Sequence, residues 1–140
     1  MERVRVFFDT SAFAKRYVNE PGTDTVLEWC ERASEIGLSA VALPELVSAF
    51  CRLQRDAKIT RVHYLQLKAM LLADMEDATI CDLTPDVLGQ AILALETNVL
   101  RSLGAIHIAS AVVLKADVFV SAAKRQLEAA AKAGLNVQQV

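Results

Sequence analysis

Hydrophobic positions along this chain follow two alternating patterns. Short apolar runs rich in β-branched and aromatic residues alternate with longer segments in which apolar residues recur every three or four positions. The first pattern is typical of buried strands and the second of helices. The strand pattern occurs at residues 3–8, 36–41, 79–83, 117–121 and 136–138. Strands that alternate with helices predict a mostly parallel sheet covered by helices on both faces.

Capping residues set the expected helix boundaries. Thr23 and Thr60 are good N-caps, and Pro85 after Thr84 stands at the favoured first position of a helix. Gly134 is a typical residue to follow the last helix. The expected helices span residues 11–17, 24–33, 44–58, 61–75, 85–97, 102–115 and 123–133.

Composition narrows the class of protein. The 140 residues, 54% hydrophobic and 23% charged, suit one domain, residues 1–140, with a well-buried core. A net charge of −2 gives no global attraction to nucleic acid or anionic lipid, so a polyanion would have to meet a local basic patch.

Cysteine usage and hydropathy bear on the cellular compartment. Cys30, Cys51 and Cys81 are odd in number and lack metal-ligand spacing, which argues against a disulfide framework and a structural zinc. The chain shows neither a signal-peptide core at its start nor an apolar stretch of about 18 residues. We therefore expect a cytoplasmic protein without a membrane partner.

Two acidic residues stand where ligands are expected in such a fold. Asp9 follows the first apolar run, and ligands of open α/β sheets bind beyond the carboxyl ends of the strands. The alternative is that Asp9 only caps the next helix. Glu45 follows Pro44 in the first turn of a helix, where an acid also favours the helix dipole. Asp9 and Glu45 together are the candidate pair for metal or phosphate chemistry.

Four segments, taken in order, resemble the successive motifs of PIN domains of the VapC toxin type. They are FDTSA at 8–12, LPEL at 43–46, LRSLGAIHIA at 100–109 and ADVFVSAAKRQL at 116–127. The resemblance implies a three-layer α/β/α fold with a parallel sheet of order 3-2-1-4-5. It also implies a Mg²⁺- or Mn²⁺-dependent endoribonuclease, the toxin of a toxin–antitoxin pair, which forms a homodimer and binds an antitoxin-like protein.

The resemblance also assigns candidate site residues, since similar proteins hold their metal with four acids beside a Ser or Thr. Asp9 and Glu45 take the first two acid positions as catalytic and metal-binding residues, and Ser121 takes the hydroxyl position. Gly104 and Ala123 stand where the other two acids are expected. Because Mg²⁺ prefers several hard oxygen ligands, we expect metal binding that is weak, dependent on substrate or absent, and nuclease activity that is weak or absent.

Four basic residues follow the strand ends that should flank this site: Lys15, Arg16, Lys124 and Arg125. They are placed to contact phosphates of RNA, although an ordinary solvated rim would show the same residues.

Other polar residues have simpler explanations. His107, in an apolar helix, is expected to be a hydrogen-bonded packing residue. Asp82 and Asp86 should lie at the edge of the sheet and Asp117 at its opposite, amino end. Glu96 precedes the helix that contains Gly104, so a bent loop would be needed to make it a substitute ligand. Trp29 and Tyr64 are expected to pack in the core or in a dimer interface.

Three alternatives to an impaired nuclease stay open. The first is a catalytically inactive PIN-like scaffold that binds a protein partner or RNA through its basic rim. An engineered inactive variant of an active nuclease would have the same sequence features. A receiver-type signalling domain shares the α/β layering, but it needs an acid pair near the first strand, and only Asp9 is there.

Overall fold

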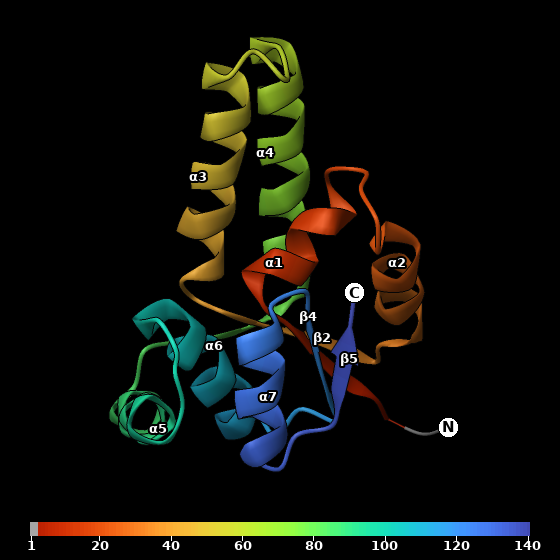
Figure 1. The fold of residues 1–140 in the computed structure, drawn as a ribbon. Helices are drawn as coiled ribbons and strands as arrows, with labels where there is room; N and C mark the ends of the chain where they lie inside the picture. Colours follow the sequence, from red (N-terminus) through yellow and green to blue (C-terminus); the bar gives the residue numbers. More distant parts are fainter. Residues whose placement is uncertain (1–2) are drawn as a thin grey trace.

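Five parallel strands form one sheet in the order β3-β2-β1-β4-β5 in the computed structural model, which describes residues 3–140 (Figure 1). The strands are β1 (Arg5–Phe8), β2 (Glu35–Ser39), β3 (Thr79–Cys81), β4 (Val118–Ser121) and β5 (Val137–Gln139). The predicted sheet and its strand order are confirmed. The second and third strands end two residues earlier than expected, because the chain turns there toward the next helix.

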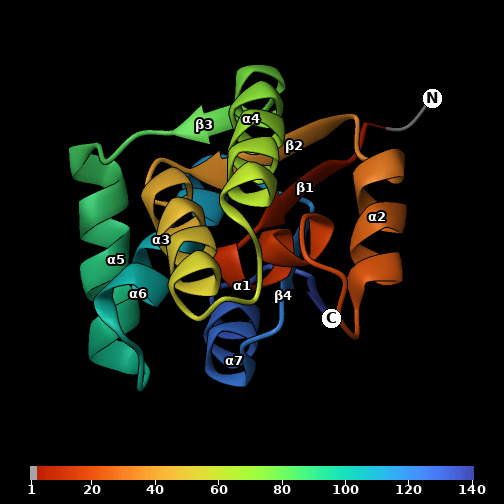
Figure 2. The ribbon, with the colours of Figure 1, turned by 90° about the horizontal axis from the view of Figure 1, so that it is seen from above.

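Helices cover both faces of the sheet. One layer contains α1 (Thr10–Phe13), the 3₁₀ helix η1 (Ala14–Arg16), α2 (Thr23–Arg32), α3 (Ala42–Arg55) and α4 (Arg61–Asp77). The other contains α5 (Pro85–Thr97), α6 (Ser102–Val113) and α7 (Lys124–Lys132). Helices α3 and α4 lie side by side and project beyond the sheet, whereas α5 lies at the outer edge beside α6 (Figures 1 and 2).

Side-chain alternation along β1 builds a core on each face of the sheet. Val6 and Phe8 pack with α1, α2, α3 and α4, whereas Phe7 packs with α6 and α7. β1 is the central strand, and Val6 is paired with Ile36 of β2 and Val118 of β4. Because both faces of β1 are buried, its residues read as a continuous apolar run.

Helix starts agree with the sequence where a side chain caps the helix. Thr60 Oγ1 accepts a hydrogen bond from the His63 N–H at 3.1 Å, and Thr84 Oγ1 accepts one from the Val87 N–H at 3.3 Å. We expected Thr23 to be the N-cap of α2, and this was wrong. Thr23 is the first residue of α2. Gly22, with φ of 100°, precedes α2 and makes the turn that few other residues adopt.

The remaining local expectations concern packing and hydropathy. All three cysteines are free, and Tyr64 is buried in the core between α3 and α4. Trp29 packs at the border of that core, with the Arg32 guanidinium 4.2 Å above its ring. Among residues 3–140 we find no helix of the length and hydropathy that crossing a membrane requires.

Candidate active site at the carboxyl edge of the sheet

The order of the strands creates a crevice at Asp9. From β1 the chain continues to β2 on one side, and it later returns to β4 on the other side. In open α/β sheets, ligands bind beyond the carboxyl ends of the strands at such a switch point. The Asp9 N–H donates to the Val120 carbonyl at 3.1 Å, which fixes Asp9 against the end of β4.

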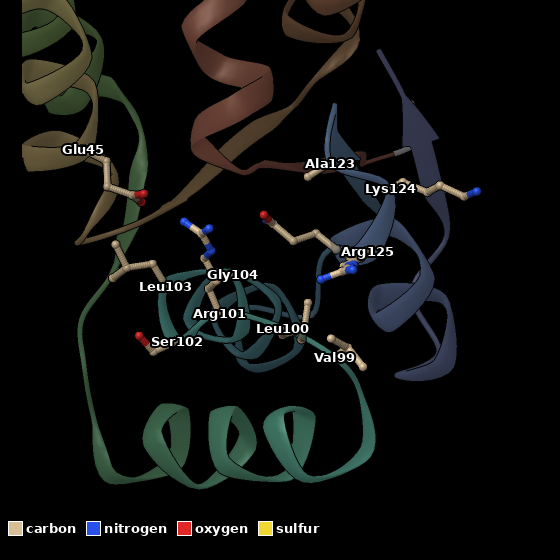
Figure 3. A pocket seen from close by; sticks show the side chains of 11 residues that line it. Glu45, Val99, Leu100, Arg101, Ser102, Leu103, Gly104, Ala123, Lys124 and Arg125 are labelled. Carbon is tan, nitrogen blue, oxygen red and sulfur yellow. The ribbon is translucent and has the colours of Figure 1, made fainter. Parts of the chain in front are cut away.

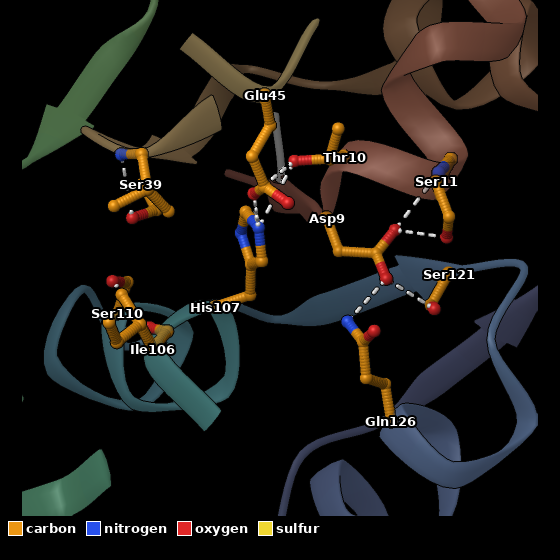
Figure 4. A network of polar contacts seen from close by, with 12 residues as sticks. Asp9, Thr10, Ser11, Ser39, Glu45, Ile106, His107, Ser110, Ser121 and Gln126 are labelled. Carbon is orange, nitrogen blue, oxygen red and sulfur yellow. Dashed lines mark hydrogen bonds and ion pairs between the residues drawn. The ribbon is translucent and has the colours of Figure 1, made fainter. Parts of the chain in front are cut away.

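The Asp9 carboxylate is buried, with 1% of the residue exposed, and it accepts four hydrogen bonds (Figure 4). Oδ1 accepts from Ser11 Oγ at 2.7 Å and from the Ala12 N–H at 2.9 Å. Oδ2 accepts from Ser121 Oγ at 2.5 Å and from Gln126 Nε2 at 2.6 Å. Burial raises the pKa of Asp9, and the hydrogen bonds from Ser121 and Ser11 act against that shift. Asp9 therefore caps α1 and also joins β1 to β4 and α7.

Two hydroxyl groups hold this carboxylate in place. Ser121 Oγ accepts a hydrogen bond from the Ala123 N–H at 2.9 Å, and Ser11 Oγ accepts one from the Ala122 N–H at 3.0 Å. Each hydroxyl thus donates to Asp9 and accepts from the loop before α7. The Ser121 hydroxyl lies beside Asp9, as the resemblance implies.

Glu45 has a separate set of partners in the first turn of α3. Its Oε1 accepts a hydrogen bond from Thr10 Oγ1 at 2.8 Å and lies 2.6 Å from His107 Nε2 (Figure 4). An ionised carboxylate only accepts, so the buried His107 ring donates from Nε2. Partial burial acts to raise the pKa of Glu45, but the hydrogen bonds from His107 and Thr10 outweigh it and lower that pKa.

Gly104 and Ala123 line one cavity of about 640 Å³, together with Glu45 and Gln126 (Figure 3). A Cβ atom at Gly104 would lie 3.3 Å from both Cγ and Cδ of Gln126. The Gln126 side chain therefore fills the space beside Gly104, and its amide reaches Asp9 from there. A neutral amide occupies the region where the resemblance predicts a third carboxylate.

Few of the side chains that usually bind metal ions come together at this edge of the sheet in the described residues. Within residues 3–140, no group of three or more His, Cys, Asp or Glu side chains comes together in a way that could hold a metal ion. Both candidate carboxylates, Asp9 and Glu45, already accept hydrogen bonds from protein donors. Mg²⁺ would have to compete with these donors, and at most these two carboxylates would bind it, with water or substrate phosphate completing its octahedral shell.

The four predicted basic residues separate into two pairs. Lys124 and Arg125 line the cavity. Lys15 Nζ instead donates to the Pro21 carbonyl at 2.7 Å and to Glu20 at 3.2 Å, and Arg16 forms a two-bond ion pair with Asp74. Lys15 and Arg16 thus hold the segment after α1 and are not among the residues that line the cavity.

The alternative acids lie elsewhere. Asp82 and Asp86 are exposed beyond the edge strand β3, and Asp117 accepts a hydrogen bond from the Arg5 N–H at the amino end of the sheet, as expected. Glu96 is exposed near the end of α5 and does not line the cavity that contains Gly104. None of these acids joins Asp9 and Glu45.

Four features of the site were not predicted. Gln126 contacts Asp9, Thr10 and His107 contact Glu45, and Arg101 lines the cavity. Gln126 follows Ala123 by three residues, a spacing that places the two on one side of a helical turn. Arg101 directly precedes α6. Gln126 and Arg101 both belong to the four segments quoted above. Their positions within those segments were the sequence signal that could have identified them as site residues.

Comparison with known proteins agrees with this architecture. The family model described as the PIN domain matches residues 6–132. The chain belongs to the PIN domain family. Comparison of its sequence with curated proteins finds no match.

Solved structures similar to this PIN domain show the same fold at low identity. The VapC20 toxin of Mycobacterium tuberculosis, described as cleaving the sarcin–ricin loop, is 17% identical with a TM-score of 0.66, covering 93% of this chain and 95% of its own. VapBC2 of Rickettsia felis, bound to a promoter DNA fragment, is 13% identical with a TM-score of 0.68, covering 98% and 99%. FitAcB of Neisseria gonorrhoeae is 13% identical with a TM-score of 0.69, covering 94% and 95%.

Proposed function

We propose that this PIN domain is a VapC-like toxin-type protein that binds RNA and an antitoxin-like protein, and whose metal-dependent ribonuclease activity is weak or absent. The main support is the pair of carboxylates at the carboxyl edge of the sheet. Asp9 and Glu45 are both engaged by protein donors, and Gly104 and Ala123 replace the other two acids that the resemblance implies.

The toxin-type assignment draws on the similar structures. VapC20 is described as a toxin that cleaves the sarcin–ricin loop, and VapBC2 as a complex bound to DNA from its promoter. We extend to this chain the type of protein, a toxin paired with an antitoxin, and RNA as the class of substrate.

The chemistry explains why activity should be low. In metal-assisted phosphodiester hydrolysis the bound ion generates hydroxide and stabilises charge on the transferring group. This chain's own residues would contribute Asp9 and Glu45 as ligands and Ser121 as a positioning hydroxyl. Loss of one supporting residue at a metal site typically costs about 10- to 100-fold in affinity or activity, so the loss of two direct ligands should cost more.

Calorimetric titration with Mn²⁺ tests this proposal directly. The unmodified protein and Glu45→Gln are each titrated in the absence and in the presence of a short non-cleavable RNA. We expect no binding without RNA, and with RNA at most weak binding that Glu45→Gln abolishes. Tight Mn²⁺ binding by the unmodified protein, with efficient RNA cleavage, would contradict the proposal.

Restoring the two acids tests the assignment of positions 104 and 123. Gly104→Asp combined with Ala123→Asp should gain Mn²⁺ binding and metal-dependent RNA cleavage. A matched control is Gly89→Asp with Ala133→Asp, since both residues are exposed and neither lines the cavity. If the restored protein folds but cleaves RNA no better than the control, positions 104 and 123 are not the lost acid positions.

A further inference from the structure

The cavity beside Gly104 and Ala123 carries positive charge. Arg101, Lys124 and Arg125 line it, whereas Glu45 is its one acidic residue. Within residues 3–140, none of these three cationic side chains forms a hydrogen bond or an ion pair. Figure 3 shows the Arg101 side chain pointing toward the middle of the cavity, with Arg125 at its opposite wall.

The acids near the cavity form no ion pair with its three cationic side chains in the described residues. Glu45 Oε1 is occupied by His107 and Thr10, and no ion pair joins Glu45 to Arg101 in the described residues. Asp9 is 1% exposed and lies behind the Gln126 amide. Arg125 also borders an adjoining cavity that Glu96 and Glu128 line, and it forms no ion pair with either of them.

Backbone groups add to the positive potential. The first turns of α6 and α7 both line the cavity, at residues 102–104 and 124–126. Neither helix has a side-chain cap, since Arg101 and Ala123 occupy the N-cap positions without a capping hydrogen bond. Uncapped N–H groups at the start of a helix favour an anion, and here they reinforce the unpaired arginine side chains.

We propose that this cavity binds the terminal phosphate of a nucleotide or RNA end directly, without a metal ion. Arg101 and Arg125 would supply guanidinium groups, which bind phosphate oxygens through paired, charge-assisted hydrogen bonds. The loss of two acids thus turns a cation site of the family into an anion site.

The size and walls of the cavity favour a nucleotide over a bare phosphate ion. A volume of about 640 Å³ falls within the usual range for small-molecule sites, which is much more than one phosphate fills. Val99, Leu100 and Leu103 add apolar surface next to the arginines. Such surface can contact the flat face of a base, while the cationic groups hold the phosphate. The inference deepens the proposed function and rests on it for RNA as the natural source of the nucleotide.

The test compares two short oligoribonucleotides of one sequence, with a 5′-phosphate and with a 5′-hydroxyl, each labelled at the 3′ end. Binding is measured by fluorescence anisotropy in EDTA, so that no metal contributes. We expect the unmodified protein to bind the phosphorylated oligonucleotide about tenfold or more tightly. Arg101→Gln with Arg125→Gln should abolish that preference.

A matched control keeps the total charge change equal. Arg52→Gln with Arg55→Gln removes two exposed arginines of α3 that do not line the cavity, and it should keep the preference for the 5′-phosphate. Because Arg101 and Arg125 are both exposed, their replacement should leave the far-ultraviolet circular dichroism spectrum unchanged. A competition experiment separates the two sources of the anion. Inorganic phosphate and an unlabelled 5′-phosphorylated oligonucleotide are added as competitors at the same concentration. Weaker competition by inorganic phosphate supports a nucleotide ligand.

Equal binding of the two oligonucleotides in EDTA would overturn the inference, as would equal loss of preference in the control variant. Competition by inorganic phosphate as strong as that by the oligonucleotide would overturn the nucleotide as ligand. These failures leave the proposed function intact, because that function fails only if the unmodified protein proves to be an efficient metal-dependent nuclease or has no affinity for RNA.

Discussion

At the scale of single residues, the site is a pair of carboxylates that accept hydrogen bonds from surrounding protein groups. Asp9 is the clearest case, because its charge is buried and its two oxygens accept four hydrogen bonds. Burial of a charge costs free energy that hydrogen bonds offset only partly, and functional sites commonly retain such a cost. The raised pKa of Asp9 shows that the folded protein disfavours the ionised form.

Replacing the charge at Asp9 should therefore stabilise the fold. We expect Asp9→Asn to raise the free energy of unfolding at pH 7 by about 1 kcal/mol, because Ser121 and Gln126 can reorient to satisfy an amide. The pKa of Asp9 is raised in the folded state, so ionisation of Asp9 lowers the stability of the fold at pH values above that pKa. This loss of stability is absent below the ordinary pKa of Asp, about 3.9, because Asp9 is then protonated in both the folded and the unfolded state. Urea denaturation at pH 7 and pH 3 should show the gain only at pH 7. The exposed Asp82→Asn is the control, and a loss of stability in Asp9→Asn alone would show that the ionised network is favourable.

Gln126 offers a second test at this scale. Gln126→Glu would place a third carboxylate where Nε2 now lies 2.6 Å from Asp9 Oδ2. Two carboxylates so close repel each other unless a proton or a cation lies between them. We expect the variant to lose about 1–3 kcal/mol of stability in EDTA, and Mn²⁺ to raise its melting temperature.

The control for this variant is Gln126→Ala, which removes the same hydrogen bond without adding charge. It should be destabilised too, but its melting temperature should not respond to Mn²⁺. If Mn²⁺ leaves the melting temperature of Gln126→Glu unchanged, Glu45 and Asp9 lie too far from position 126 to share an ion with it.

At the scale of elements, the sequence predicts best what depends on neighbouring residues. Apolar runs located the strands, and Thr60 and Thr84 marked helix starts, because capping is a contact over three residues. The resemblance placed Asp9 and Ser121 in one site, and the two residues meet because the parallel strands β1 and β4 end at the same edge of the sheet. The contacts of His107 with Glu45 and of Gln126 with Asp9 span 62 and 117 positions, so they depend on how α6 and α7 pack.

The ion pair between Arg16 and Asp74 is another contact between distant positions that depends on helix packing. It gives a third prediction. Asp74 Oδ2 accepts hydrogen bonds from Arg16 Nε at 2.9 Å and from Tyr17 Oη at 2.6 Å, which ties the end of η1 to α4. Partial burial acts to raise the pKa of Asp74, but the hydrogen bonds from Arg16 and Tyr17 outweigh it and lower that pKa. We expect Asp74→Asn to cost about 1–2 kcal/mol of unfolding free energy at pH 7.

The pH dependence of that cost follows from the direction of the shift. With the pKa of Asp74 lowered in the folded state, the stabilisation is present above its ordinary pKa of about 3.9 and is lost as the pH falls through the folded-state pKa. Thermal unfolding of the unmodified protein and of Asp74→Asn should therefore converge in acid. The nearby exposed Asp77→Asn should match the unmodified protein at every pH, and an equal loss there would assign the effect to the charge of α4 as a whole.

At the scale of the whole molecule, two helices expose several large apolar residues, α5 and α4, and α5 lies farthest from the active site's central strand. It lies at the outer edge of the structure and packs against α6 (Figure 2). Leu88, Ile92 and Leu95 are 45%, 57% and 39% exposed, and their spacing places them on one face of the helix. Several exposed large apolar residues on one helix indicate an interaction surface. We propose that this face forms the contact between two copies of the chain.

A charge in the middle of that face should prevent association. We expect the unmodified protein to sediment as a dimer at micromolar concentration and Ile92→Glu to sediment as a monomer, because a buried, unpaired carboxylate would cost several kcal/mol. The control is Met70→Glu, since Met70 is 51% exposed on α4. Dissociation by Met70→Glu instead would move the interface to the α3–α4 projection, and a monomeric unmodified protein would remove the proposal.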